Sequence, residues 1–125
     1  MPAPAPIVDV IAVLVFVLIG RSSHAESETL AGITRTSWPF LHGTALGWLL
    51  ARRRGRELSS PAAGLWVWPT TVVVGMLARA ASGQGVDAAF VVVASAFLGL
   101  FLLGWRLVGG LARTRLRRSG RRLRD

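Results

Sequence analysis

The chain contains no cysteine, no tyrosine and no lysine. The absence of cysteine excludes disulfide bonds, thiolate metal sites and cysteine nucleophiles. Because lysine is missing, all 15 basic residues are arginines, and with only 6 acidic residues the formal net charge is +9. A basic excess suits nucleic acid, anionic lipid or the topology of a membrane protein, and the positions of the arginines decide among these.

Apolar side chains are abundant and make up 52% of the 125 residues. A soluble domain of this size cannot bury so much apolar surface, because much of a small fold is surface. Most of these apolar residues lie in four segments, each 14 residues or longer. Their valine content could indicate buried strands, but segments of this length favour helices. We expect four membrane-spanning helices, over about residues 6–23, 33–51, 61–80 and 86–108.

Only the last two segments approach the ~20 apolar residues of a spanning helix without their flanks. The first two need polar flanking residues, and the second helix can begin near Thr29. Ser60 is expected to cap the third helix ahead of Pro61. Kinks are expected at Pro39 and Pro69, since proline inside a helix removes a backbone donor.

The first segment has an alternative interpretation as a cleaved signal peptide. Ser23 and Ala25 would supply the small residues before the cleavage site. A signal peptide also carries a basic stretch at its start, and "MPAPAP" has none. We therefore expect the first segment to be retained as a helix.

The arginines are distributed unevenly between the two ends of the predicted helices. The "RRRGRE" loop holds four and the tail "RTRLRRSGRRLRD" holds seven, whereas the opposite side holds three, Arg21, Arg35 and Arg79. By the positive-inside rule the arginine-rich side is cytoplasmic. The prediction is therefore all-α: a multi-pass cell-membrane protein with four transmembrane helices in a compact bundle over residues 1–110, a cytoplasmic tail over 111–125, and both termini cytoplasmic.

The tail suggests a partner as well as a topology. Arginines near an anionic leaflet bind its headgroups, so the lipid bilayer and anionic headgroups at the cytoplasmic face are the expected partners. Nucleic acid is not expected, because no aromatic residue is interleaved for stacking and no binding motif is present.

Asp9 and Arg106 are charged residues inside apolar segments. The predicted topology puts both on the cytoplasmic side at similar depth, near the start of the first helix and the end of the fourth. One hypothesis is that they pair, which requires those two helices to be neighbours and lowers the cost of burying either charge. The alternative is that Arg106 extends to the headgroups while Asp9 caps its helix or faces water.

Three further polar residues lie toward the predicted outer side. Arg79 and Asp87 flank the "ASGQG" turn, and we expect them to pair across it. His42 lies one turn into the second segment, where it can bond a neighbouring backbone carbonyl or relay protons.

The "HAESE" loop gathers His24, Glu26 and Glu28 in one short stretch, with His42 as a distant fourth candidate ligand. Such a loop could hold a metal weakly, but a solvated loop is the expectation, so neither a metal nor a cofactor is predicted.

Small residues suggest helix packing at two places. Gly43 and Gly47 form a GxxxG pattern, and Ser95 and Gly99 a related one. Both patterns let helix backbones approach closely, within the bundle or in a dimer face, which leaves a second copy or another membrane protein open as a partner. Five tryptophans lie mostly near the predicted span ends, as an interfacial belt would: residues 38, 48, 66, 68 and 105.

Several short motifs, in order, resemble a bacterial family of small integral membrane proteins, the domain-of-unknown-function family numbered three thousand and fifty-four. The motifs are "DVIAVLVFVLIGRSSH", "TSWPFLHGTALGWLL", "GMLAR" and "FLGLFLLGWR", within about residues 7–108. The resemblance implies a four-helix membrane domain and no activity, ligand or catalytic residue. The positions that match the family pattern are Asp9, Gly20, Arg21, His24, Pro39, Phe40, Gly75, Arg79, Gly104, Trp105 and Arg106.

The sequence favours a non-enzymatic membrane subunit, scaffold or regulator. It contains no nucleophile-elbow, zinc-protease or phosphate-loop pattern, and no paired carboxylates within the apolar segments. The alternative is a small transporter or channel that uses Asp9, His42 and Arg106.

Overall fold

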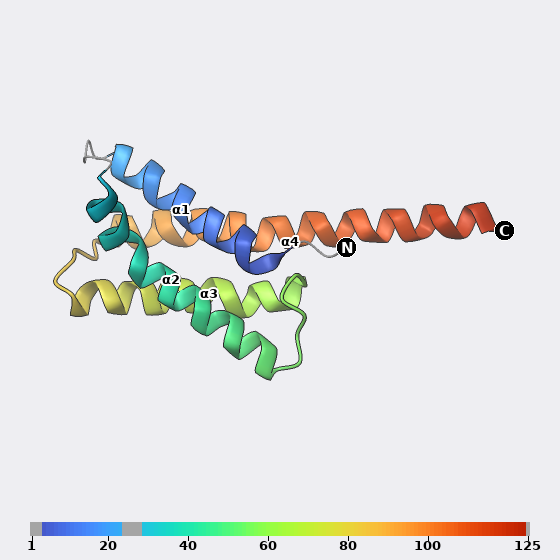
Figure 1. Ribbon diagram of the computed structural model, residues 1–125, viewed down its shortest axis with the longest axis horizontal. Helices are drawn as coiled ribbons and strands as arrows, with labels where there is room; N and C mark the ends of the chain where they lie inside the picture. The colour runs from blue at the N-terminus through green and yellow to red at the C-terminus, as the bar shows by residue number, and fades with distance from the viewer. Residues whose placement is uncertain (1–3, 24–28, 125) are drawn as a thin grey trace.

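The computed structural model describes residues 4–23 and 29–124 of the chain. This part of the chain forms four α-helices and no strand, so the all-α prediction is confirmed (Figure 1). The helices are α1 (Ala5–Ser23), α2 (Leu30–Arg53), α3 (Pro61–Ala81) and α4 (Ala88–Arg124).

The helices form a closed arrangement in which α1 packs against α2 and α4, and α3 packs against the same two helices. The neighbouring positions of α1 and α4, on which the hypothesis of an Asp9–Arg106 pair depends, are therefore confirmed. Phenylalanine rings occupy the core between them: the ring centroid of Phe16 lies 5.4 Å from those of both Phe40 and Phe97.

Side-chain caps define where α2 and α3 begin. The Thr29 hydroxyl accepts a hydrogen bond from the Gly32 amide at 3.0 Å, and the Ser60 hydroxyl accepts one from the Ala63 amide at 3.1 Å. Each cap satisfies a backbone donor that the first turn of a helix leaves open. The expected role of Ser60 is confirmed.

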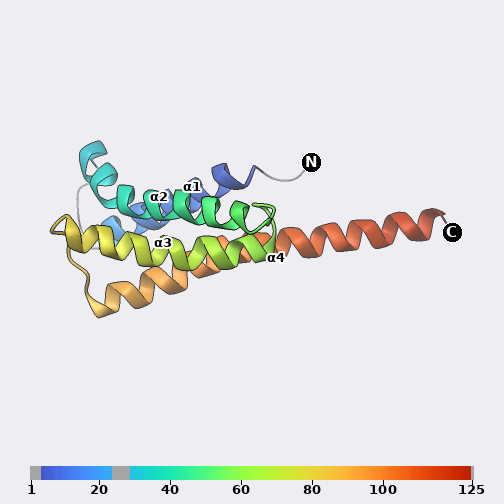
Figure 2. The same ribbon diagram turned by 90° about the horizontal axis from the view of Figure 1, so that it is seen from below.

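Pro39 and Pro69 both lie inside continuous helices. Pro39 cannot donate to the carbonyl of Arg35, four residues earlier, and that carbonyl instead accepts a hydrogen bond from the Gln84 carboxamide at 3.1 Å. Figure 2 shows the first turns of α2 set at an angle to the rest of the helix, as expected for a proline kink. The kink at Pro69 stays a prediction.

The small residues of α2 lie in its contact with α3. A Cβ atom added at Gly43 would lie 2.9 Å from the Cα atom of Thr71, and one added at Gly47 would lie 2.8 Å from the Cα atom of Val67. The GxxxG pattern therefore serves packing within the bundle. The close approach also brings the buried hydroxyls of Thr44 and Thr71 to 2.9 Å from each other.

The second small-residue pattern has a different role from the one expected. Gly99 makes room for the indole of Trp68, from α3, and Ser95 supplies a backbone acceptor for it. The Trp68 Nε1–H donates to the Ser95 carbonyl at 2.9 Å, and a Cβ at Gly99 would lie 2.7 Å from the indole ring.

The last helix extends well beyond the end of its predicted span. The arginine-rich tail continues α4 as a single helix as far as Arg124, and Figures 1 and 2 show this part projecting from the bundle. Arginine and leucine are good helix formers, so the local sequence favours this continuation. Among the described residues, two helical segments are long and apolar enough to cross a membrane, Pro61–Ala81 and Ala88–Gly120.

Candidate functional site

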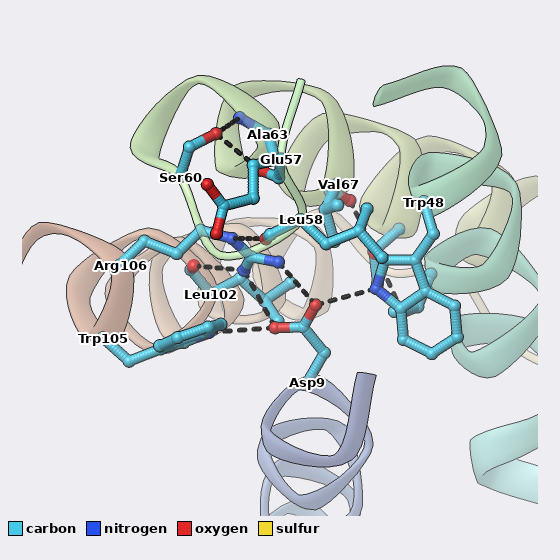
Figure 3. Close-up of polar contacts among 12 residues, drawn as sticks. Asp9, Trp48, Glu57, Leu58, Ser60, Ala63, Val67, Leu102, Trp105 and Arg106 are labelled. Atoms are coloured by element: carbon cyan, nitrogen blue, oxygen red, sulfur yellow. Dashed lines mark hydrogen bonds and ion pairs between the residues drawn. The ribbon is translucent and has the colours of Figure 1, made fainter. Parts of the chain in front are cut away.

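Charged and polar groups from three helices and one loop converge at the end of the bundle from which α4 projects. We call this group the Asp9–Arg106 cluster: Asp9 from α1, Trp48 from α2, the Leu58 carbonyl from the α2–α3 loop, and Leu102, Trp105 and Arg106 from α4 (Figure 3). Both charged side chains are 0% exposed.

The carboxylate of Asp9 accepts four hydrogen bonds. Arg106 binds it in a bidentate manner, with Nη1 2.9 Å from Oδ1 and Nη2 2.7 Å from Oδ2. The indole of Trp105 donates to Oδ1 at 2.9 Å, and the indole of Trp48 donates to Oδ2 at 2.8 Å. Each carboxylate oxygen therefore has two donors, which compensate for its removal from water.

The guanidinium group of Arg106 is also held on its other side. Its Nε–H donates to the Leu58 carbonyl at 2.9 Å, and Nη1 donates to the Leu102 carbonyl, one turn earlier in α4, at 2.8 Å. The guanidinium carbon lies 4.6 Å from the ring centroid of Trp105, a cation–π distance. Of the two alternatives from the sequence, the structure thus shows the ion pair and not an arginine that extends to the headgroups.

Space for this side chain comes from α3. A Cβ atom at Gly64 would lie 2.9 Å from Cδ of Arg106 and 2.9 Å from Cδ2 of Leu103. Gly64 is buried, and because it lacks a side chain the stem of Arg106 can pass against α3. The cluster therefore depends on all four helices, with α3 contributing only the absence of a side chain.

The arrangement is suited to holding helices together and not to exchanging protons or binding a ligand. The carboxylate has no unused oxygen and no exposed surface, so a substrate cannot reach it without opening the bundle. Charged groups that are fully paired and hydrogen-bonded instead fix the relative positions of the elements that carry them. Here those elements are α1, α2, α4 and the α2–α3 loop.

The other predicted site residues lie away from the cluster. His42 is exposed on α2, and its Nδ1 lies 2.9 Å from the Trp38 carbonyl, which is the backbone contact that the sequence suggested. His24 falls outside the described residues, and no group of metal-binding side chains occurs among those that are described.

The expected ion pair between Arg79 and Asp87 is wrong. The Arg79 guanidinium donates to the Gly85 carbonyl at 2.8 and 3.1 Å and to the Gln84 carboxamide oxygen at 3.0 Å. The tight turn brings these two acceptors closer to the guanidinium than Asp87. Asp87 instead precedes the first residue of α4, and its carbonyl accepts the Val91 amide at 3.0 Å.

The sequence did not predict the roles of three residues: the indole donors Trp48 and Trp105, and Gly64, which makes room for the side chain of Arg106. Trp48 and Trp105 were assigned to an interfacial belt, but each donates to the buried carboxylate of Asp9. One signal was present: the second and fourth segments both end in Gly-Trp followed by arginine. A shared dipeptide at the same end of two helices can indicate a common partner.

In a comparison with protein-family models, residues 6–109 match the family described as Protein of unknown function (DUF3054). The chain belongs to this family. This is the family that the sequence motifs resemble. The match extends one residue beyond the expected range, residues 7–108, at each end. Every residue of the Asp9–Arg106 cluster lies within the matched range. No curated protein and no solved structure matches the chain.

Proposed function

We propose that this member of the family is a four-span protein of the cell membrane with both termini cytoplasmic, and that it acts as a non-enzymatic subunit, scaffold or regulator through contacts of its helices. The observation that carries the proposal is the placement of polarity: the charged pair is closed inside the bundle, while large apolar side chains cover its outside. The transmembrane domain would comprise residues 1–110, and residues 111–125 would form the cytoplasmic tail.

Exposed apolar side chains occur on all four helices. Ile11 on α1, Leu49 on α2, Leu77 on α3 and Leu100 on α4 are 46–70% exposed. Water disfavours such contiguous apolar surface on a small protein, whereas lipid tails accept it. The 19 residues of α1 reach ~28 Å, close to the ~30 Å of a hydrocarbon core, so length permits α1 and the longer α2 to span as well.

The Asp9–Arg106 cluster supports the proposed orientation. Its Leu58 carbonyl belongs to the α2–α3 connection, and this connection together with the last two residues of α2 carries four of the arginines. The cluster therefore lies at the arginine-rich end, which the positive-inside rule assigns to the cytoplasm. Pairing within the bundle lowers the cost of having two charges near the membrane edge.

The geometry gives less support to a transporter or channel. Such a function would require Asp9, His42 and Arg106 to line one path. Asp9 and Arg106 are fully buried and bound to each other, whereas His42 is exposed on the surface of α2. The arginine tail is proposed to contact anionic headgroups at the cytoplasmic face; Arg113 lies near its start, 4.0 Å from Glu57 in the α2–α3 connection.

Topology reporters fused at four positions test the proposed spans. Fusions at Gly55 and Ser119 should report the cytoplasm, and fusions at Glu28 and Gln84 should report the external side. Two proposed spans lie between Gly55 and Ser119, and two lie between Glu28 and Gln84, so the positions of each pair are on the same side. A cytoplasmic signal at Gln84 would overturn the four-span topology.

Flux measurements separate a scaffold from a transporter. Liposomes containing the purified protein should show no proton flux above protein-free liposomes, since the carboxylate of Asp9 has no unused acceptor. The Asp9→Asn protein should behave the same way, and an ionophore supplies the positive control. A proton flux with the native protein above that of protein-free liposomes would contradict the scaffold and favour the transporter.

A further inference from the structure

The part of α4 beyond residue 110 is held in its projecting direction by little more than the helix itself. Residues 111–120 are all exposed except Arg113, which is partly buried. Arg113 lies 4.0 Å from Glu57, and because the two side chains are 42% and 63% exposed, their ion pair contributes little. The direction of the tail therefore depends on the continuity of α4, which Figures 1 and 2 show leaving the bundle without a break.

Two consecutive glycines, Gly109 and Gly110, lie where α4 leaves the bundle. A Cβ atom at Gly110 would lie 3.8 Å from Cγ of Pro61, the first residue of α3, and one at Gly109 would meet nothing within 4 Å. Packing therefore does not require glycine at either position. Glycine destabilises a helix interior relative to alanine, so this pair is a place where α4 can bend at low cost.

The length of α4 sets where the tail would lie if the helix stayed straight. Its 37 residues reach ~55 Å, against the ~30 Å of a hydrocarbon core. By helical rise the backbone of Arg118 lies ~12 Å beyond Gly110, and that of Arg124 ~21 Å. Both distances exceed the ~8 Å Debye length at physiological salt, beyond which exposed charges are largely screened. A straight tail would thus hold most of its arginines too far from the headgroups to bind them.

One face of the tail helix carries no charge. Ala112, Leu116 and Ser119 follow one another at spacings of four and three residues, which brings them to the same side of a helix. Leu116 is 72% exposed, and Arg117 and Arg118 lie toward the opposite side. A helix of this kind suits the surface of an anionic membrane, because its uncharged face can enter the interface while the arginines reach the headgroups.

We propose that the tail helix docks on the inner surface of an anionic membrane through the face of Ala112, Leu116 and Ser119, and that α4 bends at Gly109 and Gly110 to bring it there. Charge complementarity selects this partner, since residues 111–125 contain seven arginines and one acidic residue. The inference rests on the membrane location and the headgroup contact proposed above, to which it adds the docking face and the bend.

Spin labels can locate the tail, because the chain has no cysteine and each introduced cysteine carries the only label. Leu116→Cys places an apolar nitroxide on the docking face, and Thr114→Cys places one nearly opposite on the helix; both native residues are exposed. The full chain is reconstituted in vesicles of phosphatidylcholine with phosphatidylglycerol, and in vesicles of phosphatidylcholine alone. Relaxation of each label by oxygen, which concentrates in lipid, and by a water-soluble nickel chelate reports its depth.

In the anionic vesicles the label at Leu116 should be severalfold more accessible to oxygen, relative to the nickel chelate, than the label at Thr114. In phosphatidylcholine alone both labels should be accessible to water, because the arginines have no anionic surface to bind. High salt should return the label at Leu116 to water in the anionic vesicles as well.

Two pairs of alanine substitutions, each combined with the label at Leu116, test the bend. Gly109→Ala/Gly110→Ala strengthens the helix without a clash and should lower the ratio of docked to projecting tail by about tenfold. Gly104→Ala/Gly120→Ala is the control. It also removes two glycines from α4, at positions where an added Cβ meets nothing within 4 Å, and should leave the ratio as in the native chain.

A label at Leu100, an exposed residue within the proposed fourth span, separates failure of this inference from failure of the membrane proposal. Oxygen should reach the Leu100→Cys label in both kinds of vesicle. If it does, while the labels at Thr114 and Leu116 are equally accessible to water in anionic vesicles, the tail does not dock. Equal docking in phosphatidylcholine alone, or docking that Gly109→Ala/Gly110→Ala leaves unchanged, would also overturn the inference. A water-accessible label at Leu100 would contradict the span itself, and the docked tail with it.

Discussion

Replacing Arg106 with glutamine should lower the free energy of unfolding by about 3–5 kcal/mol. The substitution leaves the carboxylate of Asp9 buried with two indole donors but without a compensating charge, and it leaves the Leu58 and Leu102 carbonyls with fewer donors. Unfolding in mixed detergent micelles measures the loss. Arg113→Gln is the matched control, two turns further along α4, and should cost at most about 1 kcal/mol, because its ion pair is exposed and long.

A double-mutant cycle isolates the interaction between Asp9 and Arg106. Asp9→Asn alone should also be strongly destabilising, since it leaves a buried guanidinium group unpaired. Asp9→Asn with Arg106→Gln should cost less than the two single changes added, by about 0.5–3 kcal/mol. Additive losses would show that the two groups are stabilised separately by the indoles and carbonyls, and that the ion pair contributes nothing of its own.

Exchanging the charges of Asp9 and Arg106 tests their ion pair less well than the double-mutant cycle does, because the groups around each residue suit only the charge that it now carries. An aspartate at position 106 would face the Leu58 and Leu102 carbonyls, which are acceptors, and an arginine at position 9 would face two indole N–H donors. The surroundings of the pair are therefore polarised in one direction. Each charge has its own set of complementary groups, so the pair cannot be reversed without loss.

The similar depth of Asp9 and Arg106 could be inferred from the sequence because helix direction alone brings them to one end of the bundle, whereas their pairing was one of two alternatives that the sequence left open. The number of helices followed from apolar length in the same way. These features depend on one-dimensional quantities, namely segment length, spacing and the order of charges along the chain. The continuation of α4 beyond residue 108 was missed because charge predicts the end of a span but not the end of a helix.

The roles of Trp48, Trp105 and Gly64 depended on contacts between helices. A tryptophan near the end of a span is equally suited to a headgroup region and to a buried acceptor, and only the rotation of α2 and α4 about their axes distinguishes the two. Similarly, nothing in the sequence shows that a glycine in α3 makes room for an arginine from α4. The prediction that Arg79 pairs with Asp87 failed for a local reason: the guanidinium group of Arg79 donates to the carbonyl of Gly85, two residues before Asp87.

Replacing Gly43 with alanine should destabilise the bundle by about 1–3 kcal/mol, although alanine is the better helix former. The new Cβ would lie 2.9 Å from both the Cα atom and the carbonyl oxygen of Thr71, so α2 and α3 would have to separate. A backbone neighbour cannot rotate away as a flexible side chain can. Separation would also weaken the buried contact between the hydroxyls of Thr44 and Thr71.

The control for Gly43→Ala is the same substitution at Gly104, inside α4. A Cβ atom there meets nothing within 4 Å, so only helix propensity changes, and Gly104→Ala should be neutral or stabilising by up to about 1 kcal/mol. Thermal melting in one detergent compares the two proteins directly. Opposite shifts of the melting temperature are expected because the two glycines differ only in what faces them. If Gly43→Ala melts at or above the native temperature, α2 and α3 are not in close backbone contact, and the GxxxG pattern serves a surface outside the bundle.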